Sequence, residues 1–143
     1  MKYDILIVDS NPVNLNFIEE IVNGLEVNIH KATSPDSAIE IFKSRQIVLI
    51  VVSTNIDNNN ALDFIELVRG LTGGEKVKII LVSKDMPDED VIYKIINQGV
   101  VDFVNNPISP QMIIGKINVY LNIIKDKEVL ISKEIAEKHT AQS

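Results

Sequence analysis

The chain has 143 residues, of which 45% are hydrophobic and 24% are charged, a balance that suits one globular domain with a sizeable core. It contains no cysteine, which excludes disulfides, thiolate metal sites and cysteine nucleophiles. The formal net charge is −6, and lysine and arginine are scattered, which argues against nucleic acid or a membrane as a partner. The sequence has neither a signal peptide nor a membrane-spanning apolar run, so we expect a cytoplasmic protein.

Short segments rich in valine and isoleucine predict the strands of a sheet. Most of them are nearly continuous apolar runs, which is typical of parallel strands that have helices on both faces. One further segment, Val27–Ala32, alternates in polarity. The apolar runs are Ile5–Val8, Ile47–Val52, Ile79–Val82 and Val100–Val104, the last interrupted by Asp102.

Apolar residues at helical spacing fill the gaps between these segments. Three of the predicted helices begin at a capping residue followed by proline: Asn11-Pro12, Ser34-Pro35 and Ser109-Pro110. The cap accepts a hydrogen bond from a free amide, and proline has no amide to satisfy at the first helical position. The first helix is predicted to bury a face made of Phe17, Ile18, Ile21, Val22 and Leu25.

Strand and helix therefore alternate five times, which predicts a doubly wound α/β fold with a five-stranded parallel sheet. Right-handed crossovers limit the possible topologies, and the common order for five strands is 2-1-3-4-5, as in flavodoxin-like folds. In that order a functional site lies at the carboxyl ends of the first and third strands. Functional residues are therefore expected in the segments that directly follow the predicted strands.

The last predicted helix continues past the domain. Residues at near heptad spacing follow one another along it: Ile117, Leu121, Ile124, Glu128, Ile131 and Ile135. Two interpretations stay open, an extended helix that frays in solvent and a coiled-coil linker to a further domain. We divide the chain into a domain over residues 1–124 and a C-terminal helix or linker over 125–143, with a disordered end from His139.

The order and spacing of these elements resemble the receiver domain of response regulators, the phosphorylated modules of two-component signalling. The resemblance covers residues 3 to about 124. Asp4–Pro12 is similar to the family's opening strand, and Ile79–Ser83 is similar to the fourth strand with its terminal serine or threonine. Gly99–Ile108 resembles the fifth strand, which in the family usually ends in Lys-Pro.

The resemblance implies a phosphorylation pocket, and this chain keeps only part of it. In the family a histidine kinase donates a phosphoryl group to an aspartate at the end of the third strand, and two acids after the first strand hold Mg²⁺. The first acid is present as Asp9, whereas Ser10 stands at the second acid position. The position of the phosphoacceptor falls on Ser53.

At the remaining positions of the implied pocket, some of the family's residues are kept and others are replaced. Ser83 keeps the serine or threonine that bonds to the phosphate, and Asn106 replaces the lysine that pairs with it. Pro107 is kept after that position, and Phe103 stands at the aromatic switch position. Together with Tyr93, Phe103 is a candidate for the partner surface.

These replacements predict that ordinary phosphotransfer is lost. A serine hydroxyl needs a general base, and an asparagine at position 106 cannot offset phosphate charge as lysine does. Asp9, with hydroxyls and the carbonyl expected at Asn55, would bind Mg²⁺ weakly if at all. Asp9 has an alternative interpretation, in which it serves only as a cap of the first helix. We expect no enzymatic activity, because there is no Gly-x-Ser-x-Gly motif and neither histidine is placed as a base for Ser53.

Three hypotheses of function follow. The first is a pseudo-receiver that works by protein contacts with a histidine kinase or an output domain. The resemblance implies the fourth helix, fifth strand and fifth helix as its surface for partners or for a homodimer, and the C-terminal helix is a second candidate for a homodimer. The second is an atypical receiver that accepts phosphate on Asp57 or Ser53. The third is a flavodoxin-like domain for a small ligand, although the loop Asp9–Pro12 lacks glycine and brings a carboxylate that would repel phosphate.

Overall fold

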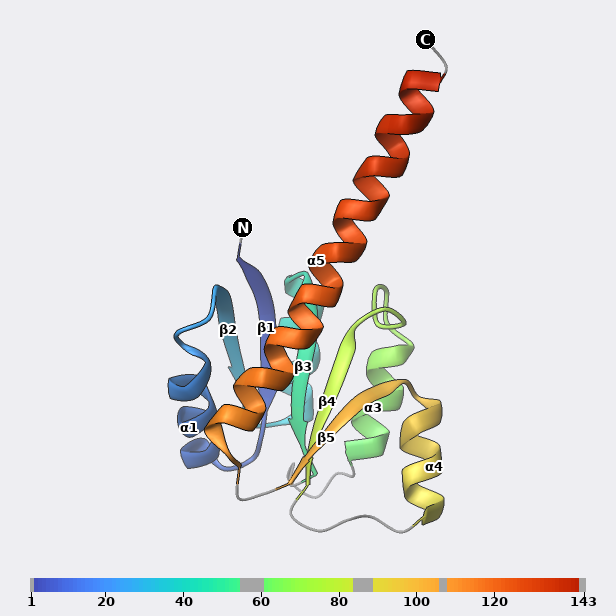
Figure 1. Cartoon of the computed structure of the whole chain (residues 1–143). Helices are drawn as coiled ribbons and strands as arrows, with labels where there is room; N and C mark the ends of the chain where they lie inside the picture. Colours follow the sequence, from blue (N-terminus) through green and yellow to red (C-terminus); the bar gives the residue numbers. More distant parts are fainter. Residues whose placement is uncertain (1, 55–60, 84–88, 106–107, 142–143) are drawn as a thin grey trace.

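The chain folds as five consecutive βα units, as the sequence predicted (Figure 1). The computed structural model describes residues 2–54, 61–83, 89–105 and 108–141. Its strands are all parallel and have the predicted order β2-β1-β3-β4-β5. The strands are β1 (Tyr3–Val8), β2 (Val27–Ala32), β3 (Ile47–Ser53), β4 (Lys78–Ser83) and β5 (Val100–Asn105).

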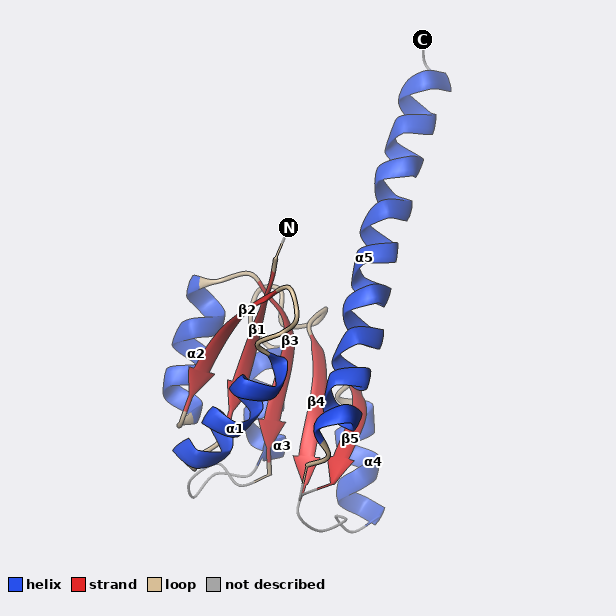
Figure 2. Ribbon diagram, turned by 60° about the vertical axis from the view of Figure 1, so that its left-hand side comes forward, coloured by secondary structure: helices blue, strands red, loops and turns tan. Residues whose placement is uncertain are grey.

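Helices cover both faces of the sheet (Figure 2). The apolar residues of α1 and α5 pack on one face, and those of α2, α3 and α4 pack on the other. This arrangement explains why the strands read as continuous apolar runs, since both of their faces are buried. The helices are α1 (Pro12–Val22), α2 (Pro35–Ser44), α3 (Ala61–Arg69), α4 (Glu89–Asn97) and α5 (Pro110–Ala141).

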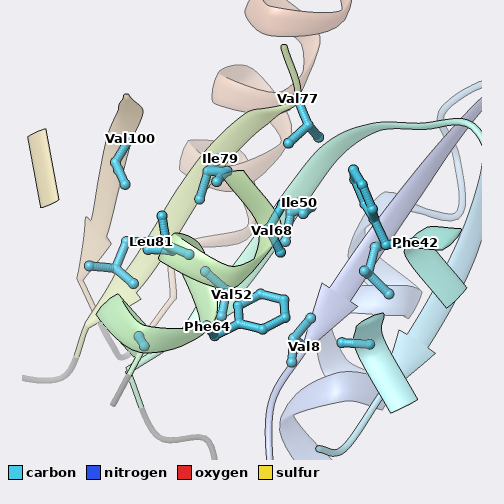
Figure 3. Packing of buried hydrophobic residues seen from close by; sticks show 14 of the residues in the cluster. Val8, Phe42, Ile50, Val52, Phe64, Val68, Val77, Ile79, Leu81 and Val100 are labelled. Carbon is cyan, nitrogen blue, oxygen red and sulfur yellow. The ribbon is translucent and has the colours of Figure 1, made fainter. Parts of the chain in front are cut away.

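The larger of the two apolar clusters lies beneath α2 and α3 (Figure 3). Phe64 of α3 is 1% exposed and belongs to the same cluster as Val52 of β3 and Leu81 of β4. On the opposite face, Ile113 and Ile117 at the start of α5 are fully buried. The packing of side chains on both faces of the sheet therefore holds the strand ends in place.

The helix starts follow the predicted capping chemistry. The Asn11 side chain accepts a hydrogen bond from the backbone N–H of Val13 (2.9 Å), and the Ser34 hydroxyl accepts one from Ser37 N–H (3.2 Å). Proline occupies the first turn of both helices. α5 also begins at its predicted proline, Pro110. These caps place the loops between strand and helix at defined positions.

The predicted buried face of α1 is wrong at one residue. Phe17 is 43% exposed, and the residues that α1 buries are Leu15, Ile18 and Val22. A short helix on a sheet buries a narrow stripe at 3- and 4-residue spacing. Phe17 falls outside that stripe, because one helical residue turns the side chain by about 100° from Ile18.

A single guanidinium joins three segments on the α3 side of the sheet. Arg69 donates to the carbonyls of Gln98 (Nε, 2.6 Å) and Gly99 (Nη2, 3.1 Å) in the turn between α4 and β5. Its Nη1 also donates to the carbonyls of Gly74 and Val77, both at 2.7 Å, in the connection from α3 to β4. Arg69 thus fixes the end of α4 relative to α3.

The helix α5 has 32 residues and projects well beyond the sheet (Figure 1). Its first part packs on the core, whereas residues 125–137 are all exposed. From the sequence we expected disorder from His139, but the helix continues to Ala141. The reason is local, because no glycine or proline follows Gly115 to end the helix.

Candidate functional site

Three polar residues are buried at the carboxyl edge of the sheet. Asp9 follows β1 and is 3% exposed, Ser53 ends β3 and is 8% exposed, and Ser83 ends β4 and is 3% exposed. Val8 lies opposite Val52 in the sheet, so Asp9 and Ser53 follow at neighbouring strand ends. The strand order reverses at β1, and such a reversal opens a crevice for function.

The Asp9 carboxylate is held by the start of α1. The backbone N–H of Asn11 donates to Asp9 Oδ1 (2.9 Å), and the side-chain amide of Asn14 donates to Asp9 Oδ2 (3.2 Å). The Asp9 N–H itself donates to the Ala32 carbonyl (3.1 Å). Both carboxylate oxygens therefore have protein donors, which stabilises the loop that enters α1.

Ser53 and Ser83 lie on adjacent strands of the same edge. The N–H of Thr54 donates to the Val82 carbonyl (2.9 Å), which continues the pairing of β3 with β4 past the last residue of the strand. In the part of the chain that the structure describes, no buried side-chain nitrogen or oxygen is left without a hydrogen-bond partner. The described part of the pocket is therefore polar, and its buried polar atoms have hydrogen-bond partners.

Several residues of the predicted pocket lie outside the described ranges. These are Asn55, Asp57, Asn106 and Pro107. Of the predicted set, the structure brings Asp9, Ser53 and Ser83 to one edge. Ser10 follows Asp9 in the same loop and is partly buried.

The described residues do not fit the two-acid magnesium site that the resemblance implies. Among the described residues, no group of three or more histidine, cysteine, aspartate or glutamate side chains is arranged to hold a metal ion. Asp9 is a buried carboxylate at this edge, and its two oxygens already accept hydrogen bonds. Mg²⁺ needs a near-octahedral oxygen set that usually includes carboxylates.

The two aromatic candidates lie in different environments. Phe103 of β5 is partly buried and packs against the cluster beneath α3. Tyr93 of α4 is 68% exposed. The structure therefore places the predicted switch residue inside the fold and Tyr93 on the surface.

An ionic network next to Phe103 was missed by the sequence reasoning. Asp102 Oδ2 accepts hydrogen bonds from Lys116 Nζ (2.8 Å) and Tyr120 Oη (3.0 Å), both on α5. Asp102 Oδ1 accepts from the Phe103 N–H (2.8 Å). The available signal was an aspartate inside an apolar strand, with a lysine and a tyrosine one helical turn apart on the helix that follows.

The pKa values in this network are shifted in opposite directions. Burial acts to raise the pKa of Asp102. Its effect is outweighed by hydrogen bonds from Lys116, the Phe103 amide and Tyr120, and by the positive charge of Lys116. The pKa of Asp102 therefore lies below its ordinary value. Burial and then the hydrogen bond to the carboxylate raise the pKa of Tyr120.

A second contact holds α5 where it leaves the domain. Tyr3 Oη, at the start of β1, donates to Glu128 Oε2 (2.8 Å). This hydrogen bond, followed by burial and the Glu128 charge, raises the pKa of Tyr3. The projecting part of α5 is thus bonded to the first strand.

The fold and its polar edge define a class of doubly wound α/β domains, and comparison with known proteins gives the family. The family model described as the response regulator receiver domain matches residues 5–118. The chain belongs to this family, and the expectation from the sequence is confirmed. In the described part of the chain, no helix combines the length and the apolar character needed to cross a membrane.

Individual relatives are distant in sequence. The "Hybrid signal transduction histidine kinase D" of Dictyostelium discoideum is 25% identical over 138 residues, which is 95% of this chain but 9% of that protein. The chain therefore corresponds to less than a tenth of the length of this relative.

Solved receiver structures share the fold. The signal receiver domain of an HD domain-containing protein from Pseudomonas fluorescens Pf-5 superposes with a TM-score of 0.77 at 22% identity, covering 85% of this chain and 96% of that one. The chemotaxis response regulator CheY4 of Vibrio cholerae gives a TM-score of 0.76 at 12% identity, over 84% and 99% of the two chains. A CheY-like receiver from Methanospirillum hungatei JF-1 gives 0.76 at 19% identity, over 89% and 99%.

Proposed function

We propose that this chain is a pseudo-receiver, a signalling module that acts through protein contacts and is not phosphorylated by the aspartate route. The observation that carries the proposal is a buried serine, Ser53, at the strand end where the family has its phosphoacceptor. A serine hydroxyl is a weak nucleophile unless a base removes its proton. Both oxygens of the neighbouring Asp9 carboxylate already accept hydrogen bonds from the start of α1.

The receiver family defines the class of partner. Receivers act in signalling with kinases and output domains, and the Dictyostelium relative is named a hybrid histidine kinase. We therefore propose a histidine kinase or an output domain as partner of a cytoplasmic, non-enzymatic module. No cofactor is required for this role.

The surface formed by α4, β5 and α5 is the proposed contact region. In the part of the chain that the structure describes, α4 and α5 carry exposed apolar side chains: Tyr93, Ile96, Met112 and Val119 are between 54% and 68% exposed. Phe103 lies beneath this surface in β5. Exposed apolar side chains on α4 and α5 offer apolar area that a protein partner would bury.

We further propose that residues 1–124 are the receiver domain and that 125–143 form a separate helical extension. Residues 125–137 are exposed, including Ile131 at 48% and Ile135 at 64%. Such a helix serves as a linker to a further domain, or as a second site for homodimerisation by coiled-coil pairing.

The test is intact-protein mass spectrometry after incubation with acetyl phosphate and Mg²⁺, with an ordinary receiver in the same tube as positive control. We expect the control to gain one phosphoryl group and the mass of this chain to stay unchanged. A mass gain on this chain would overturn the proposal and favour an atypical receiver. Loss of that gain in Asp57→Asn or in Ser53→Ala would then identify the acceptor.

The third hypothesis, a small-ligand domain, is tested by thermal melting with nucleotides and flavins. We expect no shift, because the loop Asp9–Pro12 offers a buried carboxylate where a phosphate group would have to bind. A saturable rise in melting temperature with one of these ligands would support the small-ligand hypothesis instead.

A further inference from the structure

A cleft of about 1050 Å³ lies at the amino ends of β3 and β4, beside the part of α5 that leaves the sheet. It is at the opposite end of the strands from Ser53. Ile47 and Val77 lie at its floor and are 7% and 4% exposed. Ile123 and Ile131 of α5 form a wall and are 45% and 48% exposed. The cleft therefore offers aliphatic surface on two sides.

The residues around this aliphatic surface are mainly basic. Two acids line the cleft, Glu75 and Glu128, and Glu128 already accepts the hydrogen bond from Tyr3. Among the described residues, no salt bridge joins the basic side chains that line the cleft to an acid, and the charge of Arg45 acts on Asp4. These basic residues, five in all, are Lys43, Arg45, Lys76, Lys78 and Lys127. A local excess of positive charge is unusual in a chain whose net charge is −6.

We propose that this cleft docks an acidic, amphipathic segment of a partner protein. Aliphatic side chains of the segment would cover Ile123, Ile131 and the floor, and its carboxylates would face the unpaired lysines. A helix with apolar residues on one face and acids on the other has both properties. Opposite charges across the rim would speed association and select against basic partners.

Other occupants fit less well. A nucleic acid would stack its bases on exposed aromatic rings, but the aromatic residue that lines the cleft, Phe42, is only 6% exposed. A flat anionic membrane would meet the rim lysines without covering the recessed floor. The α5 extension of a second copy brings no excess of acid, because residues 125–138 contain four acidic and four basic side chains.

This proposal does not rest on the proposed function, because the cleft and the serine pocket lie at opposite ends of the sheet. The test uses the full chain labelled with ¹⁵N and a synthetic amphipathic peptide with leucines on one face and glutamates on the other. We expect amide shift changes in residues 76–78 and 123–131, and weaker binding as salt rises from about 0.05 to about 0.5 M. A matched peptide with lysine in place of each glutamate should leave these amides unshifted.

Charge reversal gives the decisive comparison. The double variant Lys76→Glu/Lys127→Glu should bind the acidic peptide about fivefold or more weakly. Lys125→Glu/Lys133→Glu is the matched control, since it makes the same charge change on a different side of α5, away from the cleft, and should bind like the parent. Equal binding by the two variants, or shifts confined to other surfaces, would overturn the proposal. Binding to vesicles of anionic lipid without binding to the acidic peptide would overturn the proposal and indicate that the cleft faces a membrane instead of a protein.

Discussion

The Asp102 network offers a quantitative test of how α5 is attached to the sheet. In Asp102→Asn the side chain keeps its size but loses its charge, so that Lys116 and Tyr120 of α5 lose their shared carboxylate oxygen. Hydrogen bonds to a charged group contribute about 1.5–3 kcal/mol each when buried. Asp102 and Lys116 are 27% and 25% exposed, so solvent screens the pair. We therefore expect a loss of about 1–2 kcal/mol in the free energy of unfolding at pH 7.

The pH dependence follows from the lowered pKa of Asp102. A carboxyl whose pKa is lower in the folded than in the unfolded state stabilises the fold above the unfolded value, near 3.9. That contribution is lost as the pH falls through the folded pKa. The difference between the parent and Asp102→Asn should therefore be constant from about pH 5 to 7 and should close below about pH 4.

The assay is urea unfolding followed by circular dichroism at several pH values, with a double-mutant cycle that adds Lys116→Met. We expect a coupling energy of about 0.5–1 kcal/mol between the two side chains at pH 7. A difference of the same size at pH 3 and at pH 7, or a coupling energy near zero, would refute the assignment of this network as the attachment of α5.

Three further predictions concern the core and the helix contacts. Phe64→Ala should lower the free energy of unfolding by about 3–5 kcal/mol in urea titrations. Phe17→Ala, at an exposed position, should change it by less than about 0.5 kcal/mol. Similar losses in both variants would contradict the packing described. Arg69→Lys keeps the charge but loses the planar fork, so the free energy of unfolding should fall by about 2 kcal/mol, with faster amide exchange at the end of α4. Tyr3→Phe removes the hydrogen bond to Glu128 and should leave the melting temperature nearly unchanged. Amide exchange should become faster in α5 beyond Glu128. Unchanged exchange there would show that the hydrogen bond does not hold the helix.

Much of the fold could be predicted because local and global signals agree. Apolar runs such as Ile47–Val52 predict strands buried on both faces, and cap–proline pairs such as Asn11-Pro12 mark helix starts. Once five βα units are recognised, the handedness of crossovers leaves few topologies. The position of Asp9 and Ser53 at neighbouring strand ends then follows from the strand order alone.

The parts that escaped prediction depend on contacts between residues far apart in the sequence. Tyr3 meets Glu128 across 125 residues, and Arg69 meets Gln98 across 29. No periodicity marks such pairs, because each depends on how the helices are oriented on the sheet. The basic cleft was missed for the same reason, since its lysines come from three separate segments. Phe17 was misplaced because apolar periodicity does not show where a buried stripe ends.

The acid-poor pocket that we propose has a thermodynamic consequence that can be measured with Mg²⁺. A metal that binds only the folded state stabilises it by RT ln(1 + [M]/Kd), which is about 1.4 kcal/mol when the concentration is about ten times Kd. For a chain of this size that corresponds to a rise of about 4 °C in melting temperature. Asp9 alone, with both oxygens hydrogen-bonded, should give almost no rise in melting temperature.

The variant Ser10→Asp/Ser53→Asp places acids at both positions. Without metal it should melt at a lower temperature than the parent, because like charges then lie together. It should regain stability as Mg²⁺ is added. A clear Mg²⁺-dependent rise in the parent would mean that residues of the pocket outside the described ranges complete a metal site, and it would contradict the weak Mg²⁺ binding expected here.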